Sequence, residues 1–266
     1  MKLSGTKLVF DIDGVLIDTT RSYRWAIKKT AEYFLNKPIS IKDVDRIKML
    51  EGFNNDWYAG YILTNSILLG LGTDKYKDIT TGNEKISYEQ IKEVFQELYL
   101  GADKKDGLKE KEALIFSVSD LKKLTDKFGL LSIITGRTDD EAQYVLRRFK
   151  IDRFFSEVIS VENTKNFDFV KYPELRKFGQ DKSNPVLFYK LKNIRDYKHI
   201  YYIGDNISDV QLAQNSKEKL PVKSILLYKA YSVNNLKILK HRVKYSAPDY
   251  YCGTKDETIK VLLNLI

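Results

Sequence analysis

The sequence predicts an α/β protein in which a doubly wound parallel sheet carries an inserted all-helical domain. Three observations lead to this prediction. An apolar strand-like run near the N-terminus ends in the acidic motif Asp11-x-Asp13-Gly14. From about residue 106 onward, short apolar runs alternate with helix-like segments, as in a parallel sheet. The stretch between these parts has helical patterns and no convincing strand. We therefore expect a Rossmann-like core formed by residues 1–17 and 106–266 and a helical cap domain formed by residues 18–105.

The composition favours a folded cytoplasmic protein. Of the 266 residues, 43% are hydrophobic and 12% are aromatic, which excludes a disordered chain. No apolar run reaches the roughly 18 residues of a membrane span, so we expect no membrane partner and no signal peptide. Cys252 is the only cysteine, which excludes a disulfide framework. His199 and His241 are the only histidines, which argues against a histidine-based triad or a zinc site rich in histidine.

The net charge of +9 arises from 45 Lys and Arg residues against 36 Asp and Glu residues. Such an excess can indicate nucleic-acid binding. Here the basic residues are spread along the chain and mixed with acidic ones, as in Lys104-Lys105-Asp106. We interpret most of them as solvated surface that exerts a mild attraction on anionic substrates, and we do not expect nucleic acid as a partner.

Four helices are expected in the insert. Apolar residues recur at helical spacing, a polar turn at 51–57 can cap the third helix, and Ser87 with Gln90 matches a capping box for the fourth. The segment 70–85 should be a loop and the segment 101–107 a hinge. The expected helices cover residues 19–35, 41–50, about 57–69 and 87–99.

The core is expected to alternate strands with helices. Thr138 with Glu141, and Thr254 with Glu257, match capping boxes that begin two of these helices. Residues 163–181 are expected to form an additional excursion. The expected strands cover residues 8–10, 130–135, 157–161, 199–203 and 222–228. The expected helices cover residues 108–128, 138–149, 184–193, a stretch from about 208, and 254–265.

Asp11 and Asp13 stand at the end of the first expected strand, which is where open α/β sheets bind their ligands. Two carboxylates so close together repel each other and lose hydration. A hard cation such as Mg²⁺ offsets that cost because it takes carboxylate oxygens as ligands. A strand end with an Asx turn explains the same residues without any ligand. The motif alone leaves both interpretations open.

Further polar motifs stand at the other strand ends. Thr135-Gly136-Arg137 offers a hydroxyl and a glycine amide to a phosphate group, although for this motif alone a simple N-cap turn is the better explanation. Lys182 precedes an expected helix, where a lysine is usually just exposed. Asp205 and Asp209 place two more carboxylates four residues apart after a buried strand. A loop with an Asx cap is a plausible explanation for one of these two carboxylates. It is a less plausible explanation for both.

Taken together and in this order, the motifs resemble those of the haloacid dehalogenase superfamily of phosphohydrolases, over essentially the whole chain. Asp11-x-Asp13-Gly14 resembles the first motif, Thr135 the second, Lys182 with Pro185 the third, and Gly204-Asp205 with Asp209 the fourth. The helical insert resembles the family's first cap class. The turn at 52–57 and the Thr135-Gly136-Arg137 variant look like an uncharacterised branch of that class, sometimes linked with histidinol-phosphate metabolism.

The resemblance implies a Mg²⁺-dependent phosphomonoester hydrolase that acts on a small phosphorylated metabolite. Asp11 would be the nucleophile that forms an aspartyl-phosphate, and Asp13 would be the general acid and base. Thr135 and Lys182 would bind the phosphoryl oxygens. Asp209 would orient Lys182 or a metal-bound water. The resemblance assigns the metal site to Asp11, Asp13 through its backbone carbonyl, Asp205 and Asp209.

The second aspartate of the first motif also indicates which reaction to expect. The dehalogenases that name the superfamily lack it, because a halide leaving group needs no acid. A phosphatase does need one, and Asp13 would supply it.

The leaving group of the substrate should be recognised from the insert and from Gly136 and Arg137. Arg137 is favoured as a second anion contact because it follows the phosphate-binding turn. Trp57 is as readily explained as a core residue of the insert, and Arg21 and Lys48 as solvated helix charges. The candidates in the insert are Arg21, Lys48, Asn54, Asn55 and Trp57.

Several alternatives stay open. Lys171, before Pro173, is the alternative lysine for the third motif. A phosphomutase on the same scaffold would return the phosphoryl group to a sugar. A basic nucleic-acid-binding module with a vestigial site would leave the acidic motifs without a role. We expect a monomer or a homodimer, and the sequence does not name the substrate.

Overall fold

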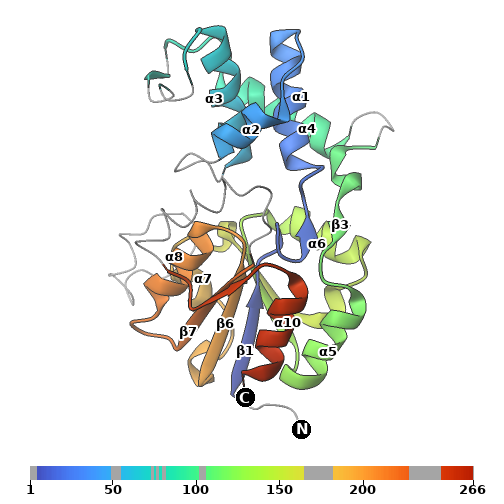
Figure 1. The fold of residues 1–266 in the computed structure, drawn as a ribbon, viewed down its shortest axis with the longest axis vertical. Helices are drawn as coiled ribbons and strands as arrows, with labels where there is room; N and C mark the ends of the chain where they lie inside the picture. The colour runs from blue at the N-terminus through green and yellow to red at the C-terminus, as the bar shows by residue number, and fades with distance from the viewer. Residues whose placement is uncertain are drawn as a thin grey trace. The chain divides into compact units, whose positions relative to one another are not determined.

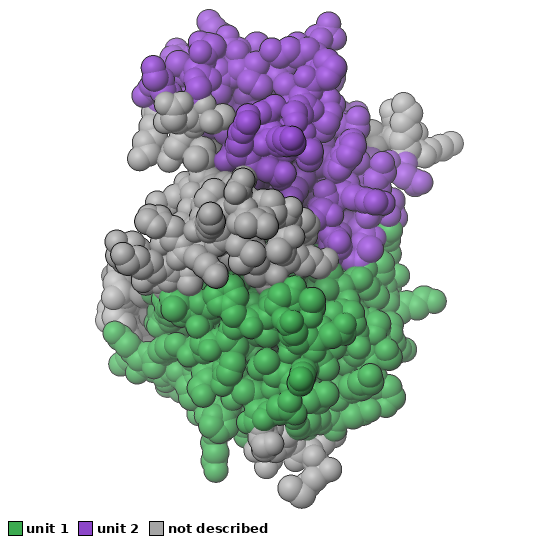
Figure 2. Space-filling model, in the orientation of Figure 1, with its two compact units in different colours: residues 1–17, 114–266 green, residues 18–113 purple. Residues whose placement is uncertain are grey.

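The chain folds into two compact units, which Figure 2 shows in different colours. Unit 1 comprises Met1–Ile17 and Leu114–Ile266, and unit 2 comprises Asp18–Ala113. The chain thus returns to the first unit at Leu114, later than the expected residue 106. The computed structural model describes residues 5–48, 55–72, 75, 78–79, 82–101, 106–164, 182–227 and 247–265.

Unit 1 is built on a parallel sheet of six strands in the order β5-β4-β1-β6-β7-β8 (Figure 1). The first strand of the chain lies in the middle, between β4 and β6, so the C-terminal ends of these three strands are neighbours. This arrangement confirms the predicted α/β class. The strands are β1 (Thr6–Phe10), β4 (Leu131–Thr135), β5 (Phe155–Ser160), β6 (His199–Gly204), β7 (Val222–Leu227) and β8 (Tyr250–Cys252).

Helices cover both faces of this sheet because side chains alternate along each strand. Leu8 and Phe10 join the core on one face, where the Phe116 ring meets Phe10 edge-on at 5.6 Å between centroids. Val9, between them, joins the core on the other face. The first face is covered by α5 (Val118–Phe128), α6 (Asp139–Arg148) and α10 (Lys255–Asn264), and the second by α7 (Val186–Tyr189) and α8 (Ile207–Ser216).

Unit 2 has a hydrophobic core of its own, formed between its helices. The rings of Tyr23 and Tyr99 stack in it with centroids 4.6 Å apart. The predicted capping box of Ser87 and Gln90 is present, with both of its hydrogen bonds formed. The described α-helices of this unit are α1 (Tyr23–Leu35), α2 (Ile41–Lys48), α3 (Asp56–Leu68) and α4 (Tyr88–Leu100), as the sequence predicts.

A short two-stranded sheet lies where the chain passes between the units. It is formed by β2 (Ile17–Asp18), on the way out of unit 1, and β3 (Ala113–Leu114), on the way back. The backbone N–H of Ile115 donates to the carbonyl of Leu16 at 2.8 Å, next to this pair. The two crossing segments are therefore bound side by side.

The predicted helix over residues 108–128 is wrong in its first half. Leu108–Lys111 is a single 3₁₀ turn, and β3 follows it. The helix begins only at Val118, because Ser117 and Asp120 form a capping box there that satisfies the first backbone N–H groups. The sequence pattern alone does not separate these pieces, because the 3₁₀ turn and the two-residue strand are too short to show a period of their own.

Two further differences lie near the end of unit 1. The helix expected over 184–193 is limited to Val186–Tyr189, and the chain then bends through Asn193, whose φ is +54°. The sixth strand, β8, was not expected, because it is only three residues long. The excursion expected at 163–181 lies outside the described residues from 165 onward. Among the described residues no helix has the length and apolarity to span a membrane.

Candidate active site

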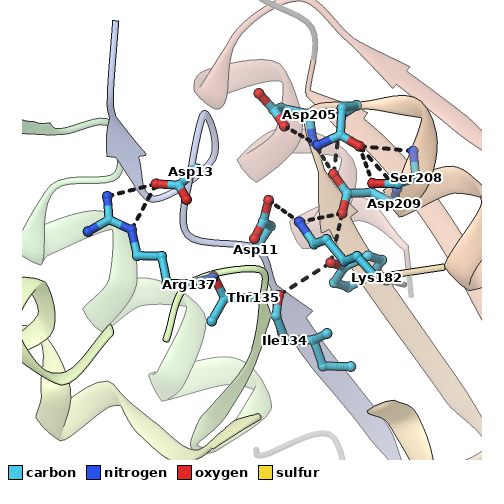
Figure 3. Close-up of polar contacts among 11 residues, drawn as sticks. Asp11, Asp13, Ile134, Thr135, Arg137, Lys182, Asp205, Ser208 and Asp209 are labelled. Atoms are coloured by element: carbon cyan, nitrogen blue, oxygen red, sulfur yellow. Dashed lines mark hydrogen bonds and ion pairs between the residues drawn. The ribbon is translucent and has the colours of Figure 1, made fainter. Parts of the chain in front are cut away.

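The polar motifs meet at the C-terminal ends of β1, β4 and β6. The backbone N–H of Asp11 donates to the carbonyl of Ile203 at 2.9 Å, so the chain leaves β1 still attached to β6. Figure 3 shows Asp11 between Asp13 and Arg137 on one side and Lys182, Asp205 and Asp209 on the other. The fold therefore brings the residues of all four motifs together at the C-terminal edge of the sheet.

Asp11 is an unusually buried carboxylate, with 1% of the residue exposed. Its Oδ2 lies 2.5 Å from the ammonium nitrogen of Lys182, whereas its Oδ1 has no hydrogen-bond partner among the described residues. Burial raises the pKa of Asp11 well above its usual value, and the positive charge of Lys182 only partly opposes this shift. An ionised Asp11 therefore calls for more positive charge than Lys182 provides.

Lys182 forms ion pairs with two carboxylates at once. Its ammonium nitrogen lies 2.5 Å from Asp11 Oδ2 and 2.8 Å from Asp209 Oδ1. Burial alone would lower the pKa of Lys182, but the charges of Asp11 and Asp209 outweigh it and raise that pKa. The two carboxylates therefore favour the protonated, cationic form of Lys182. The alternative lysine, Lys171, lies outside the described residues.

Asp209 is held by donors on both of its oxygens. Oδ1 pairs with Lys182 and accepts a hydrogen bond of 2.9 Å from the Tyr202 hydroxyl. Oδ2 accepts from the backbone N–H groups of Asp205 at 3.0 Å and Asn206 at 3.2 Å. The carboxylate thereby connects the turn after β6 to Lys182. Such bonding suits an orienting residue, which is one of the roles that the resemblance implied for Asp209.

Sequence reasoning missed Tyr202. Its ring is fully buried in β6, and burial together with the negative charge of Asp209 raises the pKa of its hydroxyl well above the usual value. A tyrosine in an otherwise apolar buried strand needs a partner for its hydroxyl. That need was the available signal, and the hydroxyl finds Asp209 Oδ1 at 2.9 Å and the Ile134 carbonyl at 3.3 Å.

Asp205 lies against Gly14, in the turn that follows β1. A Cβ atom on Gly14 would stand 1.8 Å from Asp205 Oδ2, so only glycine leaves room for this carboxylate. Gly14 also has a φ of +72°, which favours glycine. Burial and the neighbouring charge of Asp209 raise the pKa of Asp205 to about 7. The turn that contains Gly14 thus lies directly against the carboxylate of Asp205.

These carboxylates fit a divalent metal. Asp11, Asp205 and Asp209 each offer an oxygen, and the three oxygens lie within 4.8 Å of one another. Burial disfavours negative charge on Asp11 and Asp205, and Asp11 Oδ1 lacks a hydrogen bond from any described residue. A hard cation that binds oxygen ligands, such as Mg²⁺, would compensate both. The donors already bound to Asp209 leave Asp11 and Asp205 as the better candidates for direct ligands.

Asp13 points to the other side and binds Arg137. Its Oδ1 accepts hydrogen bonds from Arg137 Nε at 2.9 Å and Nη2 at 2.7 Å. Arg137 was expected to contact an anionic group of the substrate, and in the structure it contacts the carboxylate of Asp13. The side chain of Asp13 is not part of the acidic group around Asp11, Asp205 and Asp209. A contribution of Asp13 to a metal through its backbone carbonyl stays a prediction.

Thr135 is the last residue of β4, and Gly136 follows it. Thr135 is fully buried, and its Oγ1 accepts the backbone N–H of Arg137 at 3.2 Å. Gly136 faces Lys182, whose Cδ would stand 3.9 Å from a Cβ at this position. The expected phosphate-binding turn is thus adjacent to the lysine of the third motif.

The substrate candidates of the insert all belong to unit 2. Lys48 forms an ion pair with Asp56 at 2.8 Å. Asn55 caps α3 by accepting the Tyr58 N–H at 3.1 Å, and Trp57 lies under the ammonium group of Lys92 at 4.5 Å. Trp57 also packs against the core of unit 2. The structure gives each of these side chains a local partner, and their roles in substrate binding stay predictions.

Arg21 and Asn54 complete that group. Arg21 is exposed and, with Trp25 and Lys111, borders a hollow of about 530 Å³ within unit 2. Asn54 lies outside the described residues.

Comparison with known proteins places these features in a family. A family model described as haloacid dehalogenase-like hydrolase matches residues 8–217, which include all four motifs. A curated relative, named as an imidazoleglycerol-phosphate dehydratase of Phytophthora nicotianae, is 27% identical over 157 residues, which are 59% of this chain. The matched part spans 32% of that relative, about a third of its length.

Solved structures share the fold. The phosphatase Tt82 of Thermococcus thioreducens is 23% identical, with a TM-score of 0.64 over 89% of this chain and 98% of its own. A protein named as a predicted phosphoglycolate phosphatase, from Haemophilus somnus, is 16% identical, with a TM-score of 0.58 over 96% of each chain. The match of the family model over most of the chain, on a fold that these structures share, shows that the protein belongs to the haloacid dehalogenase-like hydrolases.

Proposed function

We propose that the protein is a Mg²⁺-dependent phosphomonoesterase that acts on a small phosphorylated metabolite through an aspartyl-phosphate on Asp11. The observation that carries this proposal is the state of Asp11. It is a buried carboxylate at the end of the central strand, paired with one cation, and one of its oxygens has no hydrogen bond from the described residues. A carboxylate that attacks phosphorus needs an oxygen that is free to react and a neighbouring cation that stabilises the transferring charge.

In the first step an oxygen of Asp11 attacks phosphorus, and the bond between phosphorus and the leaving oxygen breaks. Asp13 gives its proton to that leaving oxygen. Lys182 stabilises the negative charge of the transferring group, because its ammonium nitrogen lies 2.5 Å from an oxygen of the nucleophile. Thr135 offers a hydroxyl at the adjoining strand end. Bound Mg²⁺, held by Asp11 and Asp205, would supply further charge neutralisation for the phosphoryl oxygens.

In the second step a water molecule attacks the phosphorus atom of the aspartyl-phosphate. Asp13, now ionised, takes a proton from that water, and the bond between phosphorus and Asp11 breaks. The products are inorganic phosphate and the carboxylate of Asp11. Asp13 ends the cycle protonated, ready for the next leaving group, so protons balance over the two steps.

The first experiment measures phosphate release from a panel of phosphorylated metabolites, with Mg²⁺ or with EDTA. The panel includes sugar phosphates, nucleotides, histidinol phosphate and phosphoglycolate. The wild type is compared with Asp11→Asn, and Asp126→Asn, an exposed carboxylate on α5, is the matched control. We expect activity that requires metal, that is retained in the control and that falls by at least about 10⁴-fold in Asp11→Asn.

A direct readout accompanies the rates. Acid quenching of the wild type during turnover should leave one phosphoryl group on the peptide that contains Asp11, detectable by mass spectrometry. Turnover that persists in Asp11→Asn would contradict the covalent mechanism. Transfer of the phosphoryl group to a second sugar hydroxyl, in place of water, would indicate a phosphomutase instead.

A further inference from the structure

Arg137 stands out because it is a buried cation bound to the proposed acid–base residue. Only 1% of its side chain is exposed, whereas 32% of the Asp13 side chain is exposed. The two residues are 124 positions apart in sequence and come from different strand ends, β4 and β1. Burying a guanidinium is costly unless its charge is paired. Its placement beside Asp13 therefore calls for an explanation.

The geometry of the pair is asymmetric. Two N–H groups of Arg137, on Nε at 2.9 Å and on Nη2 at 2.7 Å, donate to the same oxygen, Asp13 Oδ1. The guanidinium is a rigid planar fork, and charge-assisted hydrogen bonds of this kind are the strong ones. Among the described residues the carboxylate receives its hydrogen bonds from Arg137. The rotation of the Asp13 side chain is thereby restricted.

The start of the Arg137 side chain is fixed as well. The backbone N–H of Arg137 donates to Thr135 Oγ1 at 3.2 Å, and Thr135 is itself fully buried at the end of β4. The guanidinium is thus carried on a turn that is bound to the sheet. Figure 3 shows the second oxygen of Asp13 on the side of Asp11, away from the guanidinium.

We propose that Arg137 is a positioning residue that fixes the Asp13 carboxylate, so that Oδ2 is the oxygen that gives the proton to the leaving group and takes it back from water. Two N–H groups occupy Oδ1, and a proton on that oxygen would point at a cation. Oδ2 accepts no hydrogen bond from Arg137, and a proton on it would not point at the guanidinium. This inference rests on the proposed function, in which Asp13 is the general acid and base, and it gives Arg137 no direct contact with substrate.

The test uses the leaving group. An alkyl phosphate needs an acid in the first step, whereas 4-nitrophenyl phosphate has a stable leaving anion and needs little help. In Arg137→Gln we expect the first turnover of an alkyl phosphate to slow by about 10²-fold, the effect of a misplaced catalytic group. The first turnover of 4-nitrophenyl phosphate should slow by less than about threefold, and KM should stay unchanged for both. Rapid quenching measures both rates.

A double-mutant cycle identifies the route of the effect. In an Asp13→Asn background, Arg137→Gln should cause no further loss with the alkyl phosphate, since there is no acid left to position. Arg147→Gln, an exposed arginine on α6, is the matched control and should match the wild type. Arg137→Lys keeps the buried charge without the fork, so it should fold and restore only part of the rate, which makes the test independent of the stability of Arg137→Gln.

Two results would overturn the proposal. One is a rise in KM of similar size for both substrates, which would make Arg137 a substrate contact. The other is a full additional loss in the Asp13→Asn background. Failure of the proposed function is distinct, because it appears in the wild type and in Asp11→Asn before any Arg137 variant is made.

Discussion

At the scale of single residues, the main feature of this site is the pairing of buried positive and negative side chains. Lys182 is the cation that contacts two buried carboxylates, Asp11 and Asp209, and both ion pairs are short. Removing one partner of a buried pair is far more costly than the pair is worth, because a charge is left buried and uncompensated. The contribution of Lys182 to folding and its contribution to chemistry should therefore both be large.

We predict that Lys182→Met lowers the free energy of unfolding by about 3–5 kcal/mol. The rate of phosphate release should fall on the order of 10²–10³, as for the loss of one electrostatic contact to a transition state. Urea unfolding and steady-state kinetics measure the two effects. Lys123→Met, an exposed lysine on α5, is the control and should change neither quantity. An unchanged rate in a folded Lys182→Met would remove this lysine from the mechanism.

The identities of the charged residues were largely predictable from the sequence, whereas their pairings were not. Asp11, Asp205 and Asp209 follow from motifs at strand ends, and Lys182 follows from the family resemblance. The choice of Asp13 as the partner of Arg137 depends on how two separate turns approach each other. Spacing in one sequence carries no information about that approach, so Arg137 was expected to meet a substrate instead.

At the scale of elements, the turn after β1 matters as much as the strand. Gly14 permits the carboxylate of Asp205 to lie directly against the turn, where a Cβ would stand 1.8 Å from Oδ2. The obstacle is a short rigid side chain in the fourth motif, which cannot move aside without leaving the site. A substitution at this glycine should therefore act on the metal site rather than on the core.

We predict that Gly14→Ala abolishes Mg²⁺-dependent activity while most of the fold persists. The matched control is Gly129→Ala at the end of α5. Its φ of +81° resembles the +72° of Gly14, but no atom lies within 4 Å of the added Cβ. Backbone strain should lower the free energy of unfolding of Gly129→Ala by about 1–3 kcal/mol, because its φ of +81° and ψ of −167° lie in a region that essentially only glycine adopts. Only Gly14→Ala should lose Mg²⁺ binding, measured by calorimetry. Equal binding in both would show that the contact with Asp205 is unimportant.

The elements that carry motifs were predictable because each is a strong local pattern. A buried run ending in polar residues identified β1, β4 and β6, and Ser87 with Gln90 identified the start of α4. The incorrect predictions concern short elements. β8 is three residues long and α7 is four, so each spans little more than one period of its pattern, which is too short to recognise in the sequence. β8 can be identified as a strand only from its parallel pairing with β7.

At the scale of the whole molecule, the last strand of the sheet is secured by a polar clamp. Asp249, just before β8, accepts the Ser224 backbone N–H at 2.8 Å and pairs with Lys217 at 2.9 Å. Burial alone would raise the pKa of Asp249, but these partners outweigh it and lower that pKa. The stability that Asp249 provides is thus present above its unfolded pKa of roughly 4 and is lost as the pH falls through its folded value.

We predict that Asp249→Asn lowers the free energy of unfolding at pH 7 by about 1–2 kcal/mol. The difference from the wild type should shrink as the pH falls from about 4 through the lower pKa of the folded state, because the wild-type carboxyl then becomes protonated and neutral, like the amide of Asn. Denaturant unfolding over a range of pH measures both. Asp126→Asn, in an exposed pair with Lys122, should stay within about 0.5 kcal/mol. A difference independent of pH would show that the charge of Asp249 is not involved.

The pairing of β2 with β3 has a consequence for the history of such a protein. Because the outgoing and returning segments are hydrogen-bonded neighbours, the ninety-odd residues between them occupy what is topologically a single loop of the sheet domain. Those residues also bury a core of their own. An insertion with adjacent ends and its own core can be lengthened, replaced or recombined without changing the order of the strands. Under the proposed function, selection could therefore alter the range of substrates in one part of the gene while the hydrolytic machinery stays constant in the other.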